Sequence, residues 1–332
     1  MNPATAAVGF SMLSPSATFP LVIEPNLLGL NPIHWACEQR DLIESALRRY
    51  GALLFRHFDL QTPSEFEAFA EAISPGLYGE YGDLPKKEEG NNIYRSTPYH
   101  EQKMILFHNE SSHLPSLPRK IWFFCELPSR SGGATPLVDI REMVRRLPLE
   151  LAARFEQKSL LYIRTFVEGL DVPWRDFFRT DDRTEVEAQC RAAGTDFEWL
   201  DEEVLQTRTL CHAIIRHPLT GERAFFNQIQ LHHPSSLDPQ TREELIDLLG
   251  EDRLPRNVLY GDGTRIEDDV MRLVGKLYEE CAVRFPWQRG DVIMLDNMLT
   301  AHARDPYEGP RKIVVAMGEM TSRSVLQSSL VS

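Results

Sequence analysis

The sequence predicts an α+β fold, and three observations support this prediction. Apolar runs typical of strands lie toward both ends of the chain, whereas helical periodicity dominates the middle. With 332 residues, of which 42% are hydrophobic, the chain can bury a substantial core. No change of composition, low-complexity linker or internal repeat divides the sequence. We therefore expect a single domain over residues 16–325, preceded by a loose tail at residues 1–15 that is rich in Ala, Ser and Pro.

Most of the expected helices have a recognisable start or stop signal, and the one at residues 41–50 also has an apolar stripe. Thr62 and Glu65, for example, form a capping box in which Pro63 occupies the first helical position. Gly51 and Gly194 are typical of residues that end helices. By these criteria, helices are predicted at residues 41–50, 62–73, 139–146, 148–157, 184–193, 238–250 and 267–284.

The expected strands are short apolar runs bounded by turn residues. A turn at residues 217–221 joins two of them, and the turn at residues 289–291 leads into another. Strands are predicted at residues 52–55, 93–96, 104–107, 209–216, 223–229, 292–296 and 312–317.

The most informative motif is His108-Asn109-Glu110, which is followed far downstream by His302. Two histidines and one carboxylate are the ligand set of a mononuclear non-haem iron(II) site, which leaves coordination positions open for a co-substrate and O₂. On a strand, residues two apart point to the same face, so His108 and Glu110 can both reach one metal ion. His302 follows the strand at residues 292–296, and we expect a loop to present it.

A His-x-acid pair by itself has little specificity. With 10 histidines and 49 acidic residues in the chain, about 1.5 such pairs are expected by chance. A second pair, His57-Phe58-Asp59, is indeed present and also follows an apolar run. The sequence around each pair therefore has to decide between them.

Further motifs accompany His108 and none accompanies His57. In chain order, they are Gly-Gly-x-Thr at residues 132–135, Phe-Asn-Gln at 226–228, Tyr-Gly-Asp-Gly at 260–263, and an Asp-Asn-x₄-His…Arg run at 296–311. On these motifs, residues 104–143 and 286–320 resemble the taurine/2-oxoglutarate dioxygenase family (the TauD/TfdA type), and in particular its syringomycin-type aspartate hydroxylases of natural-product pathways. The resemblance extends from about residue 20 to residue 320.

This resemblance implies a double-stranded β-helix (jelly-roll) core with helices packed outside it. It also implies an enzyme, a 2-oxoglutarate-dependent dioxygenase that uses Fe(II), 2-oxoglutarate and O₂ to oxidise an unactivated C–H bond. His108, Glu110 and His302 would be its metal ligands and catalytic residues. Halogenating relatives replace the carboxylate with a small residue. Because Glu110 keeps it, hydroxylation or a related oxidation is favoured over halogenation.

The family's co-substrate has a second carboxylate that must be held away from the metal. 2-Oxoglutarate chelates iron through its C1 carboxylate and C2 ketone, which leaves the C5 carboxylate. Arg311 is the expected partner, because a guanidinium forms two parallel hydrogen bonds with a carboxylate, and Thr135 would add a hydroxyl group. Lys312 and Arg304 are alternatives to Arg311. Asn227 and Gln228 end a predicted strand and could point into the cavity.

The expected substrate is an amino acid or a derived acid in natural-product biosynthesis, either free or tethered to a peptidyl carrier protein. Desaturation or cyclisation would use the same residues. A zinc hydrolase with His₂Glu ligation is an alternative in which Arg311 and Thr135 would have no role. A non-enzymatic metal-binding jelly roll is a third reading. A zinc deaminase is excluded, because the Pro-Cys-x-x-Cys motif of that class is missing.

Composition limits the partners and the compartment. The formal net charge of −13 argues against nucleic acid, which is bound through Lys and Arg. The sequence contains neither a signal-peptide pattern nor a run of 18 apolar residues, so we expect a cytoplasmic protein with no membrane partner. The five widely spaced cysteines are expected to be reduced. A homo-oligomer is left open.

A carrier-bound substrate would require a docking face. Carrier proteins are usually acidic, so docking to this acidic chain would need a local basic patch. Arg141, Arg145 and Arg146 fall at helical spacing and are the best candidates. The alternative is a solvated helix face with charge pairs such as Glu142 with Arg146.

Overall fold

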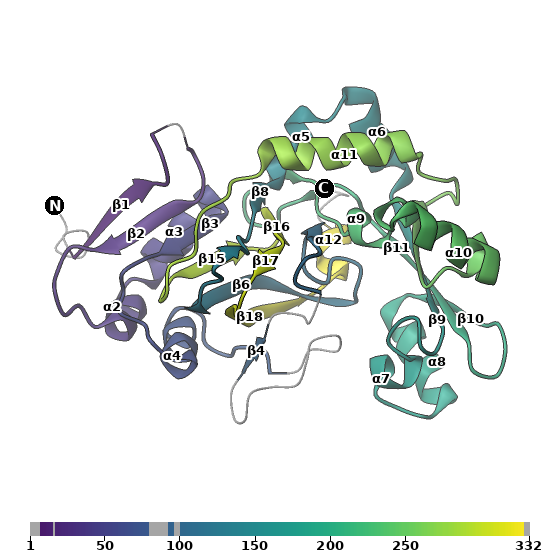
Figure 1. The fold of residues 1–332 in the computed structure, drawn as a ribbon, viewed down its shortest axis with the longest axis horizontal. Helices are drawn as coiled ribbons and strands as arrows, with labels where there is room; N and C mark the ends of the chain where they lie inside the picture. Colours follow the sequence, from purple (N-terminus) through teal and green to yellow (C-terminus); the bar gives the residue numbers. More distant parts are fainter. Residues whose placement is uncertain (1–6, 16, 80–91, 96–99, 329–332) are drawn as a thin grey trace. The chain divides into compact units, whose positions relative to one another are not determined.

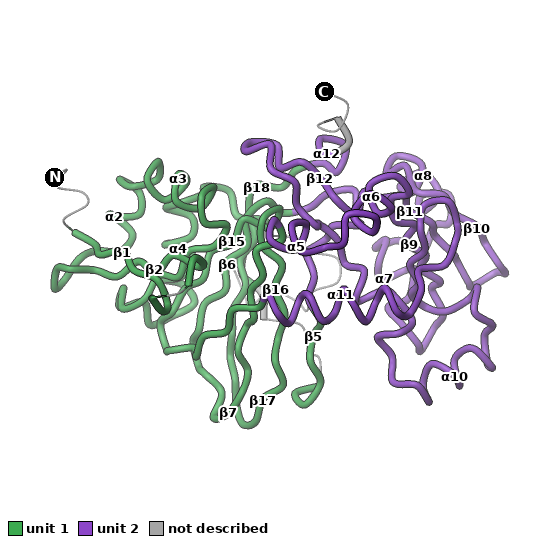
Figure 2. The backbone as a smooth tube through the Cα atoms, turned by 90° about the horizontal axis from the view of Figure 1, so that it is seen from above, with its two compact units in different colours: residues 1–106, 118–140, 282–321 green, residues 107–117, 141–281, 322–332 purple. Residues whose placement is uncertain are grey.

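The computed structural model of the protein describes residues 7–15, 17–79, 92–95 and 100–328. The chain forms two compact units, each assembled from several segments (Figure 2). Unit 1 consists of residues 1–106, 118–140 and 282–321, and unit 2 of residues 107–117, 141–281 and 322–332. The predicted domain at residues 16–325 includes segments of both units.

Unit 1 is built on a sheet of seven strands (Figure 1). In spatial order, these are β1 (Val8–Met12), β2 (Leu21–Pro25), β3 (Ala52–Phe55), β15 (Val292–Asp296), β6 (Ser116–Leu127), β18 (Lys312–Ser322) and β4 (Ile93–Arg95). β2 pairs with β3 in parallel, and β15 pairs antiparallel with both β3 and β6. Early and late parts of the chain therefore share one sheet.

One face of this sheet is covered by three helices, α2 (Pro32–Glu38), α3 (Arg40–Tyr50) and α4 (Pro63–Ile73). Because side chains alternate between the faces of a strand, Trp122 and Phe124 point toward these helices whereas Phe123 points away. The ring of Phe124 stacks on that of Phe66 in α4, with the centroids 5.2 Å apart. Burying each such side chain stabilises the unit by about 1.5–3 kcal/mol.

The opposite face packs against a second β-layer. Its three-stranded sheet has the order β5 (Ile105–His108), β16 (Thr300–Arg304) and β8 (Leu137–Asp139). Leu137 belongs to the same buried cluster as Phe123 and Ile293 of the larger sheet. A short ribbon pairs β7 (Ser131–Gly132) with β17 (Tyr307–Glu308). Two packed β-layers with helices outside are the architecture that the resemblance implied.

Unit 2 has its own antiparallel sheet and most of the helices. The sheet has the order β10 (Asp196–Trp199), β11 (Leu205–Cys211), β9 (Leu160–Phe166) and β14 (Arg256–Tyr260). The helices are α5 (Ile140–Arg146), which begins at the boundary with unit 1, α6 (Leu149–Lys158), α7 (Trp174–Phe178), α8 (Arg183–Ala193), α9 (Ile229–His232), α10 (Pro239–Leu249), α11 (Asp268–Cys281) and α12 (Ser324–Ser328). Short elements are β12 (Ile215–Arg216), β13 (Arg223–Ala224), and the 3-10 helices η1 (Pro234–Ser236) and η2 (Glu251–Arg253). Phe166, Trp174 and Leu205 form part of a separate apolar cluster in this unit.

The helices that were predicted from local signals are confirmed. The Thr62 hydroxyl accepts a hydrogen bond from the backbone N–H of Glu65, and the Glu65 carboxylate accepts one from that of Thr62. α3 ends at Gly51, which has a φ of 76°, a value that glycine adopts without steric cost. These signals lie within a few residues of the feature that they specify.

Several sequence predictions about individual elements are wrong. The expected loose tail includes Val8–Met12, which instead forms β1 by pairing with Leu21–Pro25. The strand expected at residues 223–229 is limited to Arg223–Ala224, and α9 begins at residue 229. The loop expected around His302 is the strand β16. In the first and third cases the pairing partner lies outside the sequence window that the prediction used.

The basic patch expected for carrier docking is largely neutralised. Arg141 is buried, and its Nη1 lies 3.0 Å from Oε2 of Glu222. Arg145 and Arg146 both donate to the carboxylate of Glu142, each across 2.7 Å. The solvated, internally paired helix face is therefore the better description of α5.

Two compositional expectations can be compared with the described residues. No helix in the described ranges combines the length and the apolar character that a membrane span requires. The five cysteines are free, and three of them are buried. Burial raises the pKa of Cys125 to about 12 and that of Cys190 and Cys211 to about 11, so these three thiols stay protonated and unreactive at neutral pH.

Candidate metal centre

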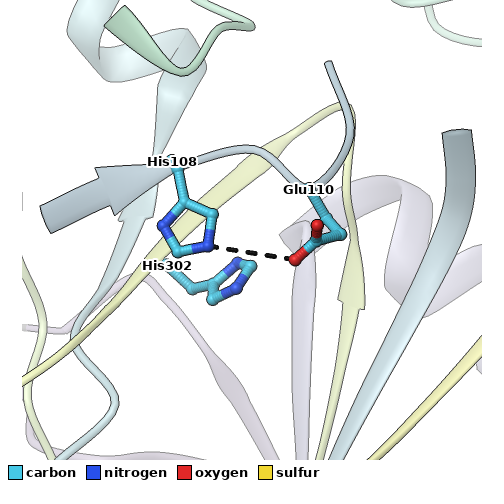
Figure 3. Close-up of side chains that lie close together, drawn as sticks. All are labelled: His108, Glu110 and His302. Carbon is cyan, nitrogen blue, oxygen red and sulfur yellow. Dashed lines mark ion pairs between the residues drawn. The ribbon is translucent and has the colours of Figure 1, made fainter. Parts of the chain in front are cut away.

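His108, Glu110 and His302 lie together in the structure (Figure 3). One ligand atom from each side chain lies within 4.8 Å of those of the other two. Nε2 of His108 and Oε2 of Glu110 are 3.9 Å apart. Within the described ranges, no other group of three or more His, Cys, Asp or Glu side chains is arranged to hold a metal ion.

The two candidate ligands of the His-x-Glu motif lie in different kinds of backbone. His108 is the last residue of β5, and the neighbouring Phe107 stacks on Tyr278 of α11, with the ring centroids 5.1 Å apart. Glu110 lies in the following turn, in which Ser111 has a φ of 56°. The expectation that both residues lie on one strand is therefore wrong, although their side chains do converge.

His302 occupies the middle of β16, where it pairs in register with Leu137 of β8. Its ring lies 5.0 Å from that of Phe123, a core residue of the larger sheet. A strand that is paired and packed on the core holds a ligand more rigidly than a loop would.

These residues fit a divalent iron ion. Two imidazoles and one carboxylate are the donor set of the non-haem iron(II) triad, in which the remaining coordination positions stay open. Two donor atoms that each lie about 2.1 Å from one ion are about 3 Å apart when they are cis and about 4.2 Å apart when they are trans. The 3.9 Å between Nε2 of His108 and Oε2 of Glu110 lies between these values, so a small rotation of the side chains would bring both atoms to cis positions.

The Gly-Gly-x-Thr motif allows a close approach of backbone segments. Gly132 and Gly133 have φ values of 68° and 69°, which favour glycine. A Cβ atom at Gly132 would collide with the carbonyl oxygen of Pro306. A Cβ atom at Gly133 would lie 3.0 Å from Cδ of Arg311 and 3.0 Å from Cβ of Tyr307. The two glycines therefore let this segment lie directly against Arg311.

In the part of the chain that the structure describes, the hydrogen-bond partners of the Arg311 cation are neutral groups. Its Nε donates to the carbonyl oxygen of Gly133 across 3.0 Å, and its Nη2 lies 3.5 Å from Oγ1 of Thr135. No carboxylate pairs with it among the described residues. Burial and the nearby Arg304 lower the pKa of Arg311 to about 10, so the guanidinium is still charged at neutral pH. A cation in these surroundings favours an anionic ligand.

Thr135 is oriented by Trp287, a residue that sequence reasoning missed. Nε1 of Trp287 donates to Oγ1 of the buried Thr135 across 3.1 Å. An indole N–H can only donate, so the Thr135 oxygen must accept, and its own proton is directed elsewhere. A buried tryptophan needs an acceptor for its N–H, but the sequence does not indicate which one.

The two alternatives to Arg311 have other partners. Nζ of Lys312 pairs with Oε2 of Glu126 at 2.7 Å. Nη2 of Arg304 donates to the carbonyl oxygens of His100 and Lys103 across 2.8 and 2.7 Å. Both cations thus have structural roles, which leaves Arg311 as the better candidate for an anion site.

The remaining histidines lie apart from the cluster. His57 is exposed, and its Nδ1 lies 2.9 Å from Oε1 of Glu24. His113 is packed against the rings of Tyr162 and His232, at centroid distances of 5.3 and 4.6 Å. The backbone N–H of Asn227 and the side-chain Nε2 of Gln228 both donate to Asn109.

Jelly rolls that carry two histidines and a carboxylate close together are characteristic of 2-oxoglutarate-dependent dioxygenases. The family model of the taurine catabolism dioxygenase TauD, TfdA family matches residues 19–317 of this chain. The chain belongs to this family and is a 2-oxoglutarate-dependent dioxygenase, a class that uses Fe(II), 2-oxoglutarate and O₂.

Individual relatives support the same assignment. The chain is 35% identical over 276 residues to the dapdiamide synthesis protein DdaC of Enterobacter agglomerans, a match that covers 83% of this chain and 84% of that protein. It is 26% identical over 291 residues to a clavaminate synthase-like protein of Arabidopsis thaliana, with 84% of each chain covered. The fold resembles that of PvcB, an Fe, alpha-ketoglutarate dependent oxygenase from an isonitrile synthetic pathway, with a TM-score of 0.54, 11% identity, and coverage of 94% of this chain and 91% of that one.

Proposed function

We propose that His108, Glu110 and His302 bind Fe(II), and that Arg311 and Thr135 bind the C5 carboxylate of 2-oxoglutarate. The observation that carries the proposal is the convergence of the three ligand atoms within 4.8 Å. Arg311 adds independent support, because it is charged, lies beside a hydroxyl group and has no acidic partner among the described residues.

Bound iron would supply the redox chemistry, in which one oxygen atom of O₂ enters succinate as CO₂ is released and the other enters the product. The residues of the chain bind and orient the reactants. Arg311 offers a planar pair of N–H groups to the distal carboxylate. Thr135 can donate its hydroxyl proton to the same anion, because Trp287 occupies the oxygen as a donor. Burial excludes water here and strengthens these charged contacts.

We further propose that the substrate is an amino acid or a derived acid in natural-product biosynthesis. The similarity to a dapdiamide synthesis protein supports a biosynthetic role. The reaction is hydroxylation of an unactivated C–H bond, and desaturation or cyclisation would use the same residues. The substrate is either free or bound to a carrier protein.

A zinc hydrolase is disfavoured by the surroundings of Arg311. Hydrolysis needs a metal-bound water but no second anion site. The charged Arg311 guanidinium, which pairs with no acid among the described residues, would then be held in a largely buried place at a cost in stability and without a function.

Anaerobic titration distinguishes the two readings. Addition of Fe(II) and 2-oxoglutarate to the metal-free protein should produce a weak visible charge-transfer band, which neither component produces alone. The His57→Ala protein should give the same band, and the His302→Ala protein should give none. Absence of the band in the wild-type protein, together with metal-dependent hydrolysis, would favour the hydrolase. Screening free and carrier-bound amino acids for succinate release then identifies the substrate.

A further inference from the structure

The convergence of His108 and Glu110 is not explained by β-structure alone. β5 ends at His108, so the strand ladder does not determine the direction of the Glu110 side chain. The single residue between them, Asn109, is fully buried. Its backbone joins the peptide that follows His108 to the peptide that precedes Glu110. Whatever fixes Asn109 therefore fixes the relative direction of both ligands.

Asn109 is bound by a segment more than a hundred residues away in sequence. Its backbone N–H donates to the carbonyl oxygen of Asn227 across 3.0 Å. In return, the backbone N–H of Asn227 donates to Oδ1 of Asn109 across 3.2 Å. The side chain of Asn227 is itself held, because its Nδ2 donates to the carbonyl oxygen of Ala213 and its Oδ1 accepts from the N–H of Ile229.

Gln228 completes this set of contacts on the other side of Asn109. Its side-chain Nε2 donates to the carbonyl oxygen of Asn109 across 3.0 Å. Its backbone N–H donates to Oη of Tyr162 across 2.9 Å, and its carbonyl oxygen lies 3.3 Å from Nδ1 of His232. Gln228 is therefore held by groups that are themselves buried in unit 2.

We infer that Asn227 and Gln228 are positioning residues, which hold Asn109 and thereby aim His108 and Glu110 at one point. The inference rests on the proposed function, since it assigns these residues a role in metal binding. It also accounts for the Phe-Asn-Gln motif, which no other feature of the site uses.

The chemistry of the contacts explains why amides occupy these positions. The carbonyl oxygen of Asn109 requires a donor, which the Gln228 amide supplies without a charge. A carboxylate at residue 228 would place an acceptor against the carbonyl oxygen of Asn109, which is also an acceptor. It would in addition bury a charge. Groups that orient metal ligands from behind typically change metal affinity by about 10–100-fold when they are removed.

Gln228→Met tests the inference, because it removes the donor and nearly preserves the volume of the side chain. The dissociation constant for Fe(II), measured by anaerobic calorimetry on the purified full-length protein, should rise by about 10–100-fold. The visible spectrum of the Co(II)-loaded protein should also change, since it reports the geometry of the ligands. A purely structural role would lower the melting temperature without altering the spectrum of the folded fraction.

Gln230→Met is the matched control. Gln230 is a buried glutamine in α9, the short helix that Gln228 precedes, and its Nε2 faces Gly275 of α11. The same substitution there should perturb packing to a similar degree but leave the Fe(II) affinity and the Co(II) spectrum unchanged.

A second pair of variants covers the case in which Gln228→Met does not fold. Asn109→Ala removes the Oδ1 atom that accepts from Asn227, and it should weaken Fe(II) binding by a similar factor. Asn109→Asp retains that atom, so it should bind Fe(II) more tightly than Asn109→Ala does. Wild-type affinity in both Gln228→Met and Asn109→Ala would overturn the inference. Equal Fe(II) affinity of the wild-type and His302→Ala proteins would instead overturn the proposed metal site.

Discussion

The side chains of the proposed ligands, His108, Glu110 and His302, lie around one point, and the other histidines do not belong to this group. Replacing His108, Glu110 or His302 with Ala removes one of three donors, so each variant should lose stoichiometric Fe(II) and turnover while it stays folded. His57→Ala is the matched control, because His57 belongs to the other His-x-acid pair and is exposed beside Glu24. Metal analysis and circular dichroism measure the outcome. Iron lost from the His57 variant and retained in the His108 variant would contradict the assignment.

Arg311 can be tested separately from the metal. Arg311→Ala removes charged hydrogen bonds, each of which contributes about 1.5–3 kcal/mol. The apparent affinity for 2-oxoglutarate should therefore fall by about 10–100-fold, with the iron content preserved. Lys312→Ala should leave the affinity unchanged, because Lys312 pairs with Glu126. An unchanged KM for 2-oxoglutarate in Arg311→Ala would indicate that Arg304 or Lys312 binds the C5 carboxylate instead.

For single residues, the sequence identifies the candidate metal ligands but not the residues that orient the side chains of the site. His108, Glu110 and His302 follow from residue type and motif order, and the structure brings their ligand atoms together. Trp287 and Gln228 could not be assigned roles in advance, since a buried N–H group has many acceptors to choose from in a chain of this length. The choice depends on contacts between residues 152 and 119 positions apart.

Arg56 and Asp291 connect the end of β3 to the start of β15. The guanidinium forms two hydrogen bonds with the carboxylate, at 3.0 and 2.7 Å, and Asp291 is buried. Removing one partner of a buried pair typically costs about 3–5 kcal/mol, so Asp291→Ala should be strongly destabilised in urea unfolding. The matched control, Arg130→Ala, breaks an exposed pair with Glu308 and should cost at most about 1 kcal/mol. Equal losses of stability would contradict this ranking.

Helices and strands differ in how far they can be predicted here. The start of α4 is specified by Thr62 and Glu65, which are neighbours in sequence. β16 exists because Thr300–His302 pair with Leu137–Asp139, more than 150 residues earlier. β1 likewise depends on β2 rather than on its own composition. Local signals therefore predict helices, whereas the strand that carries His302 required the whole fold.

The stability of the molecule should fall as the pH is lowered below about 6.5. Burial and Arg256 lower the pKa of His232 to about 3, and burial and His232 lower the pKa of His113 well below its ordinary value. In the unfolded chain both imidazoles take up a proton near pH 6.5, whereas in the folded protein they stay neutral. The unfolded state is therefore favoured as the pH falls, by about 1.4 kcal/mol per pH unit for each histidine.

Urea unfolding between about pH 7 and pH 5 measures this slope in a range above the ordinary pKa values of carboxylates. His232→Asn keeps a donor for the carbonyl oxygen of Gln228 but cannot titrate, so its slope should be smaller than that of the wild type. His113, His212 and His233, whose pKa values are also lowered by burial, still contribute to the slope of both proteins. Equal slopes for the two proteins would show that His232 is not responsible.

The net charge of −13 affects any encounter with an acidic carrier protein. Because the expected basic patch is paired internally, the dominant long-range force on such a carrier is repulsion. Added salt screens this repulsion, and the screening length is about 8 Å at physiological ionic strength. Turnover of a carrier-loaded amino acid should therefore increase with salt, whereas turnover of the free amino acid should not. Faster turnover of the loaded form at low salt would indicate an attractive docking face instead.

The double glycine at residues 132 and 133 also constrains how this enzyme can change through mutation. A Cβ atom at Gly133 would lie 2.5 Å from Oγ of Ser129 and 3.0 Å from both Cδ of Arg311 and Cβ of Tyr307, so any side chain there would press on all three residues. A single extra methyl group could thus displace the proposed co-substrate anchor, although it lies outside that contact. Random mutagenesis would register this position as essential. The reasons would be the volume of the substituent and the backbone strain that a φ of 69° imposes on any side chain, and not the chemistry of the substituent.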